Sequence, residues 1–118
     1  MIAQLWDQVV AAMTGLGYRL DPSEADSLRD RHFTVSLPSV QREDKASTFA
    51  RLRVLRDVRI RLQFIEKKDT YFHRDITQEV ERVVVALRPA LLFESSTLIE
   101  RAGGKIAEIS FSTFDTLS

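Results

Sequence analysis

Apolar and polar residues alternate along residues 51–65, and this stretch carries the clearest structural signal in the chain. Every second position of its second half is apolar: Val58, Ile60, Leu62 and Phe64. Side chains of a β-strand point alternately to opposite faces, so the pattern predicts a strand with one buried and one solvent-facing side. The phase breaks only at Leu55 and Arg56, where we expect a β-bulge or a bend. Fully extended, residues 51–65 would span roughly 50 Å, a length that predicts contact with another subunit.

Two other stretches have the apolar spacing of amphipathic helices. Residues 2–16 form the first, with Trp6 and Met13 on its apolar stripe, and we expect both side chains in the core. Residues 75–87 form the second, which Pro89 brings to an end.

Shorter alternating stretches predict two further strands, residues 32–37, which Pro38 ends, and residues 105–111. Residues 39–48 are charged and polar and predict a loop. Residues 91–101 are ambiguous between a short strand, a loop and a short helix. The expected order is helix, strand, strand, helix, strand. We therefore predict one α+β domain, residues 1–118, built as a two-layer sandwich in which two helices cover one face of a mainly antiparallel sheet.

Positive charge is concentrated on the long strand, although the chain as a whole has 17 basic and 17 acidic residues. Residues 1–50 carry 5 Lys/Arg against 7 Asp/Glu, residues 51–65 carry 5 against 1, and residues 66–118 carry 7 against 9. The net charges of these segments are therefore −2, +4 and −2. Such a stripe suits an acidic protein surface or nucleic acid. The neutral total argues against a protein whose main task is to grip a nucleic-acid backbone.

Sequence patterns for catalysis, cofactors and membranes are absent. The chain has no cysteine, and its two histidines, His32 and His73, stand in no metal-binding motif. It also lacks phosphate-binding and dinucleotide-binding glycine loops. We expect no enzyme activity, no catalytic residue, no cofactor and no metal. The longest apolar run, residues 83–87, is too short to span a membrane, and residues 1–8 do not resemble a signal peptide, so we expect a cytoplasm-like compartment.

Four arginines would share the solvent-facing side of the long strand: Arg51, Arg53, Arg59 and Arg61. The simplest interpretation is the solvated outer face of a sheet. Arginine is also the residue best suited to fixed ion pairs at interfaces. A sheet that binds RNA usually exposes aromatic side chains beside its basic residues, whereas Phe64 falls on the apolar side of this strand.

The layout of the chain resembles the tail terminator proteins of long-tailed bacteriophages, the lambda-type family that closes the tail tube. The matching parts are the helix at 2–16, the strand HFTVSLP, the long strand RLRVLRDVRIRLQFI, the helix at 75–87 and the strand KIAEISF. Those parts cover nearly the whole chain. The resemblance is one of element order, and no motif residue carries over.

This resemblance implies a structural virion protein, assembled in the host cytoplasm, that forms a hexameric ring in the tail or neck. Such a ring stops polymerisation of the tail tube, joins head to tail, and contacts the tail tube protein and head–tail connector proteins. Passage of DNA through the ring is a further expectation. Arg51, Arg53, Arg59 and Arg61 are the expected interface or lumen residues, and the long strand is expected to add to a neighbour's sheet. The resemblance leaves open whether the chain is instead a head–tail stopper or adaptor, or a part of a gene transfer agent. The alternative function is a small nucleic-acid-binding module that uses the arginine-rich strand.

Overall fold

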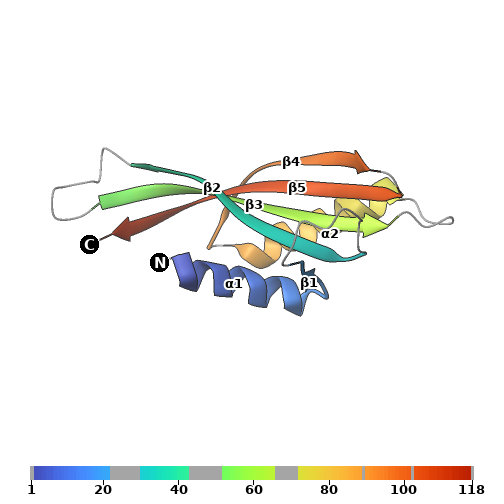
Figure 1. Ribbon diagram of the computed structural model, residues 1–118, viewed down its shortest axis with the longest axis horizontal. Helices are drawn as coiled ribbons and strands as arrows, with labels where there is room; N and C mark the ends of the chain where they lie inside the picture. Colours follow the sequence, from blue (N-terminus) through green and yellow to red (C-terminus); the bar gives the residue numbers. More distant parts are fainter. Residues whose placement is uncertain are drawn as a thin grey trace.

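The protein is a mixed α+β structure with two helices and a five-stranded sheet, as the sequence predicts in outline (Figure 1). The computed structural model describes residues 2–21, 30–42, 52–65, 72–88, 90–101 and 103–117, and the side chains of 4–21, 30–40, 54–65, 76–88, 90–101 and 103–114. Its elements, in chain order, are α1 (Ile2–Gly15), β1 (Arg19–Leu20), β2 (His32–Arg42), β3 (Leu52–Ile65), α2 (Phe72–Leu87), β4 (Leu92–Arg101) and β5 (Gly104–Leu117). Two of the strands, β1 and β4, were not part of the predicted order.

The sheet has the strand order β1-β2-β3-β5-β4. Strands β2, β3, β5 and β4 are antiparallel to their neighbours, and only the two-residue β1 pairs in parallel with β2. The prediction of a mainly antiparallel sheet is therefore confirmed. Strand β3 lies in the middle, with β2 on one side and β5 on the other.

Both helices contribute to one core that includes the central strands. Strand β3 supplies the four alternating residues that the sequence indicated, all of them buried: Val58, Ile60, Leu62 and Phe64. Strand β5 supplies Ala107, Ile109 and Phe111, α1 supplies Val9 and Met13, and α2 supplies Ile76, Val83 and Leu87. Met13 is fully buried as expected, whereas Trp6 is 36% exposed, so the expectation that Trp6 lies in the core was wrong.

A β-bulge lies in β2 and not where the sequence suggested. The pairing of β2 with β3 shifts between Ser36 and Ser39, so that two residues of β2 lie opposite one residue of β3. The pairing of β3 with β5 continues without a break through Leu55 and Arg56, so the bulge predicted there is wrong. Proline has no backbone N–H to donate, and bulges and sheet edges tolerate this loss. Pro38 therefore sits at the bulge and does not end the strand.

The predicted polar loop at 39–48 is partly strand. Residues 39–42 belong to β2 and pair with residues 54–57 of β3. The remaining residues of that predicted loop, 43–48, lie outside the described part of the chain.

Strands β2, β3 and β5 continue well past the two helices and form a three-stranded arm, the left half of the sheet in Figure 1. The arm consists of residues 39–42, 52–57 and 112–117, which are paired across all three strands. It gives the molecule its elongated shape, with extents of 57 × 25 × 24 Å. The long strand predicted from the sequence is thus confirmed: β3 has 14 residues, and one end of the sheet extends past the helices.

Candidate functional site: an open sheet face and a free strand edge

The side chains of β3 that point away from the helices lie on the open face of the sheet. Arg59 and Arg61 are both on this face and exposed, as their alternation with the buried residues predicts. Arg53 lies in β3 opposite Thr116, but its side chain is outside the described part of the structure, as is all of Arg51. Of the four expected site residues, the structure therefore brings two together on the open face.

Acidic side chains of the same chain accompany both of these arginines. The Nε of Arg61 donates to Oε2 of Glu108, on the neighbouring strand β5, at 2.6 Å. A guanidinium nitrogen of Arg59 lies 3.4 Å from a carboxylate oxygen of Asp57. The positive charge of Arg59 and Arg61 is therefore locally balanced. Exposed ion pairs of this kind contribute about 0–1 kcal/mol to stability, so they can exchange partners at low cost.

Strand β3 has no free edge to offer a partner. It is paired with β5 over its whole length and with β2 from Val54 to Gln63. The expectation that the long strand adds to a neighbour's sheet by edge pairing is therefore wrong. Because neighbouring strands take up its backbone hydrogen bonds on both sides, only its side chains can contact a partner.

Strand β4 is a free edge instead. Within the described part of the chain it pairs only with β5, and every one of its ten residues except Ile99 is exposed. Three of the exposed side chains are large and apolar: Leu92, Phe93 and Leu98. This strand comes from the stretch 91–101 that the sequence left ambiguous.

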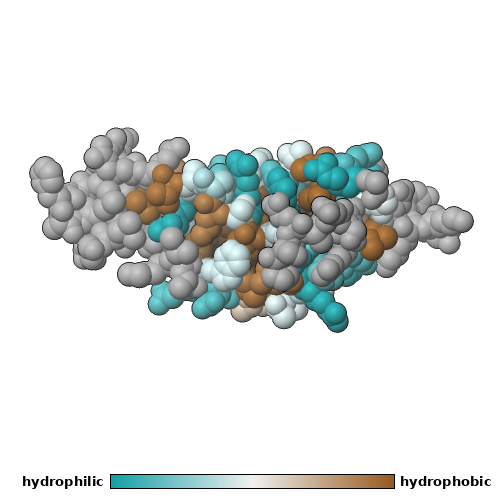
Figure 2. Space-filling model, in the orientation of Figure 1, coloured by the Kyte–Doolittle hydropathy of each residue, from teal (hydrophilic) through white to brown (hydrophobic). Residues whose placement is uncertain are grey.

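The arm also exposes apolar side chains. Val40 of β2 is 51% exposed, and Phe114 of β5 is half-exposed on the open face. Figure 2 shows apolar surface on the arm and between hydrophilic residues along the long axis. The two side chains lie on opposite faces of the arm, so each face has an exposed apolar group.

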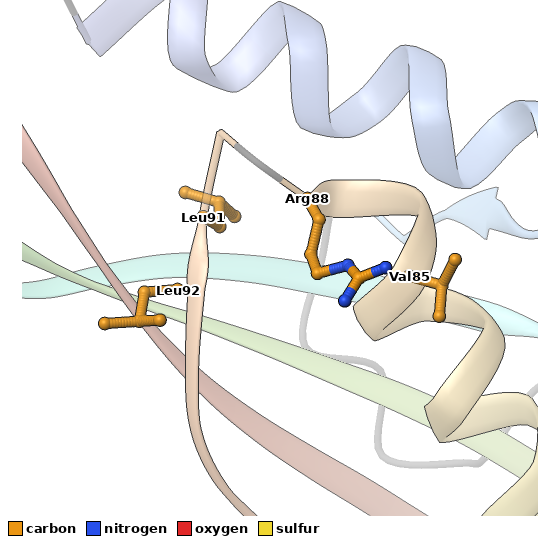
Figure 3. Close-up of a pocket in the computed structure, with 4 residues that line it drawn as sticks. All are labelled: Val85, Arg88, Leu91 and Leu92. Carbon is orange, nitrogen blue, oxygen red and sulfur yellow. The ribbon is translucent and has the colours of Figure 1, made fainter.

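An open hollow of about 580 Å³ lies between the end of α2 and the start of β4 (Figure 3). Val85, Leu91 and Leu92 give it apolar walls, and Arg88 places a guanidinium at its side. Leu91 is buried, whereas Val85 and Leu92 are exposed. The hollow can take an apolar side chain, and its described lining residues include no pair of groups suited to acid–base chemistry.

A buried tyrosine and a glutamate join the two helical regions. The hydroxyl of Tyr18, which follows α1, donates to Oε2 of Glu79 in α2 at 2.5 Å. Arg82 donates to both oxygens of Glu79, and Arg31 lies 3.4 Å from one of them. No sequence pattern indicated this cluster, because Glu79 lies on the polar face of the predicted helix and Tyr18 is 61 positions away.

The cluster changes the pKa of two groups. Burial raises the pKa of Tyr18 far above its usual 10, and the hydrogen bond to Glu79 raises it further. Burial alone would raise the pKa of Glu79, but the hydrogen bond from Tyr18, the charge of Arg31 and the hydrogen bond from Arg82 together lower it. Both groups therefore keep their usual charge at neutral pH, which suits a structural contact better than proton transfer.

The sequence predicts no metal site and no membrane-spanning segment, and the two histidines are the first residues to consider. Nδ1 of His32 lies 2.9 Å from the backbone carbonyl of Asp30, and the side chain of His73 is outside the described set. Across the described ranges no three His, Asp or Glu side chains come close enough to hold a metal ion. No helix in those ranges is long and apolar enough to cross a membrane.

Comparison with known proteins assigns the chain to no family. No protein-family model and no curated protein sequence matches the chain.

Proposed function

We propose that the protein is a structural subunit of a bacteriophage tail or neck, one that assembles as a ring at the end of the tail tube, stops its polymerisation and provides the head–tail joining surface. The observation that carries the proposal is the three-stranded arm. Three paired strands run past both helices and expose Val40 on one face and Phe114 on the other, so the arm offers both faces to neighbouring subunits.

The two-layer sandwich expected from the sequence is part of this proposal. It is supported by the single core that α1 and α2 share with β3 and β5. With the helices on one face, the opposite face of the sheet and the arm are left for contacts. A head-to-tail ring uses two different surfaces of each subunit, and an elongated subunit with an arm at one end offers two such surfaces.

Arg59 and Arg61 are the proposed interface or lumen residues within the described structure. Each has an acidic partner in its own chain, so an acidic group of a neighbour can replace that partner with little change in free energy. Arginine forms well-oriented pairs with carboxylates, which fixes the position of one subunit against the next.

The alternative function, a small nucleic-acid-binding module, has one observation in its favour and one against it. Phe114 is half-exposed on the same face as the arginines, where it could stack on a base. Asp57 and Glu108, however, neutralise the arginines in the described part of this face, and their charge would repel phosphates.

Negative-stain electron microscopy of the purified protein, at high concentration with magnesium, tests the proposal. We expect rings with a central opening. The Arg59→Glu/Arg61→Glu double variant should remain folded but form no rings, because it places like charges beside Asp57 and Glu108. A Lys67→Glu/Lys68→Glu variant changes the net charge by the same amount at positions outside β3, and it should assemble normally.

Two results would count against the proposal. If the Arg59/Arg61 double variant assembles as well as the unmodified protein, the two arginines have no interface role. If the protein stays monomeric and binds DNA or RNA with strong salt dependence, the nucleic-acid module is the better assignment.

A further inference from the structure

The free edge of β4 has one of the features with which proteins guard an edge strand, a register shift at Glu94, and lacks two others. It contains no proline and no lysine, and its charged residues lie near its two ends: Glu94, Glu100 and Arg101. The middle of the strand, residues 95–99, is uncharged. Unpaired backbone groups along such a strand form a ready template for another strand.

Strand β2 provides a second open edge on the opposite side of the same sheet. Strand β1 covers only His32 and Phe33, and in the described structure residues 34–42 pair with β3 alone. Pro38, which has no N–H to donate, and the bulge beside it interrupt this edge, so its regular backbone groups are those of residues 34–36 and 39–42. Strands β2, β3, β5 and β4 alternate in direction, so β2 runs antiparallel to β4. If a second copy is placed beside the first in the same orientation, its β2 meets β4 as an antiparallel neighbour and the alternation continues.

Exposed apolar side chains on the two edges lie on the same side of the sheet. Val40 of β2 is opposite Arg56 of β3, on the side that the helices cover. Leu98 and Phe93 of β4 are opposite Ala107 and Phe111 of β5, two core residues on that side. A continuous sheet would bring these exposed groups to one surface, where they can pack together.

The charges of the two edges also have opposite signs. Strand β4 carries two glutamates and one arginine, whereas residues 34–42 of β2 carry a single charged residue, Arg42. The hollow formed by Val85, Leu91 and Leu92 lies beside the start of β4 and can take an apolar side chain of the incoming strand.

We propose that the free edge of β4 binds the open edge of β2, residues 34–42, of a second copy of this chain, as an antiparallel strand pair that continues the sheet from one subunit to the next. The inference rests on the proposed ring function and supplies its subunit contact. Because the two edges differ, the contact is head-to-tail and each subunit keeps one edge of each kind for its two neighbours.

Hydrogen exchange of the full-length protein at increasing concentration tests the contact directly. Outward-facing amides of β4 and of residues 34–42 should gain protection together as the oligomer forms. Where nine-tenths of the chains are assembled, their exchange should slow about tenfold. Residues 104–112 of β5 are the internal control, since β3 and β4 already pair with them on both sides and their protection should not depend on assembly in this way.

Proline substitution in β4 provides the matching variants. Neighbouring residues of a strand point their N–H groups to opposite sides, so only one of Ser96→Pro and Thr97→Pro removes an amide that β5 uses. The other variant keeps the β4–β5 pairing and should be folded but monomeric. The alanine variants Ser96→Ala and Thr97→Ala leave the backbone donors in place and should assemble normally.

Each outcome decides the inference. Joint protection of β4 and residues 34–42, with loss of assembly in the folded proline variant, supports it. Rings in which β4 stays unprotected overturn it but leave the ring function standing. A dimer that protects β4 alone identifies a two-fold β4–β4 pair and overturns the inference. Monomers at all concentrations also overturn it, because they exclude the contact. In either case, ring formation on tail tubes would separately test the proposed function.

Discussion

The hydrogen bond between Tyr18 and Glu79 should contribute measurably to the stability of the fold. Tyr18 is fully buried, and its hydroxyl donates to the carboxylate at 2.5 Å, the length of a charge-assisted bond. Tyr18→Phe removes only the hydroxyl and keeps the ring, which lies edge-on to Phe64 with 6.3 Å between centroids. Hydrogen bonds to charged groups contribute about 1.5–3 kcal/mol. Because Arg82 and Arg31 still contact Glu79, we expect a loss of about 2 kcal/mol in the free energy of unfolding.

The same variant should change how stability depends on pH. The pKa of Tyr18 is raised in the folded protein, so its contribution is complete below about pH 10 and is lost as the pH rises further. The pKa of Glu79 is lowered, so its contribution is present above its usual pKa of 4.5 and is lost as the pH falls below that value. Tyr18→Phe should abolish the alkaline loss and weaken the acidic one.

Urea unfolding followed by far-UV circular dichroism, at pH 4, 7 and 10.5, measures these effects. Tyr71→Phe is the matched control, since it removes the only other tyrosine hydroxyl and leaves Tyr18 in place. It should keep the alkaline loss of stability. If Tyr18→Phe matches the unmodified protein within about 0.5 kcal/mol at pH 7, the contribution assigned to the hydrogen bond is refuted.

Three further predictions can be checked by the same unfolding measurement. Ile60→Ala should cost about 2–5 kcal/mol, because Ile60 is fully buried between the helices and the sheet. Gly103→Ala should cost about 1–2 kcal/mol, because Gly103 has φ +82° and a Cβ there meets no other atom, so backbone strain alone acts. Arg61→Ala should cost no more than about 1 kcal/mol, and salt should reduce the difference, because its pair with Glu108 is exposed.

The sequence predicted well which face of a strand or helix is buried, because buried positions recur at a fixed spacing along such an element. The alternation in β3 placed Ile60 in the core and Arg59 on the open face, and both placements are confirmed. Arg56 is the exception: it is only 6% exposed and lies on the covered side, although its charge suggested the opposite face. The predicted bulge followed from the assumption that Arg56 points to solvent. The described strands instead have register shifts in β2, beside Pro38, and in β4, at Glu94.

Strand β4 shows why another part of the fold escaped prediction. A strand covered on one face reveals itself through alternation, but β4 is exposed on nearly all sides and its sequence has no period of two. The Tyr18–Glu79 contact was missed for a related reason. It joins residues far apart in the chain, and neither residue type in isolation signals a buried pair.

The position of a strand within the sheet decides which interface it can make, and sequence alternation does not encode that position. The arginine-rich strand β3 was the natural candidate for edge pairing, because it is long and charged. Since β2 and β5 enclose it, β3 can contribute only side chains such as Arg59 and Arg61. Backbone pairing falls to the outer strands β4 and β2. The two kinds of contact are separable: the arginine variants should weaken the side-chain surface, and the β4 proline variants should remove the strand pair while the open face stays intact.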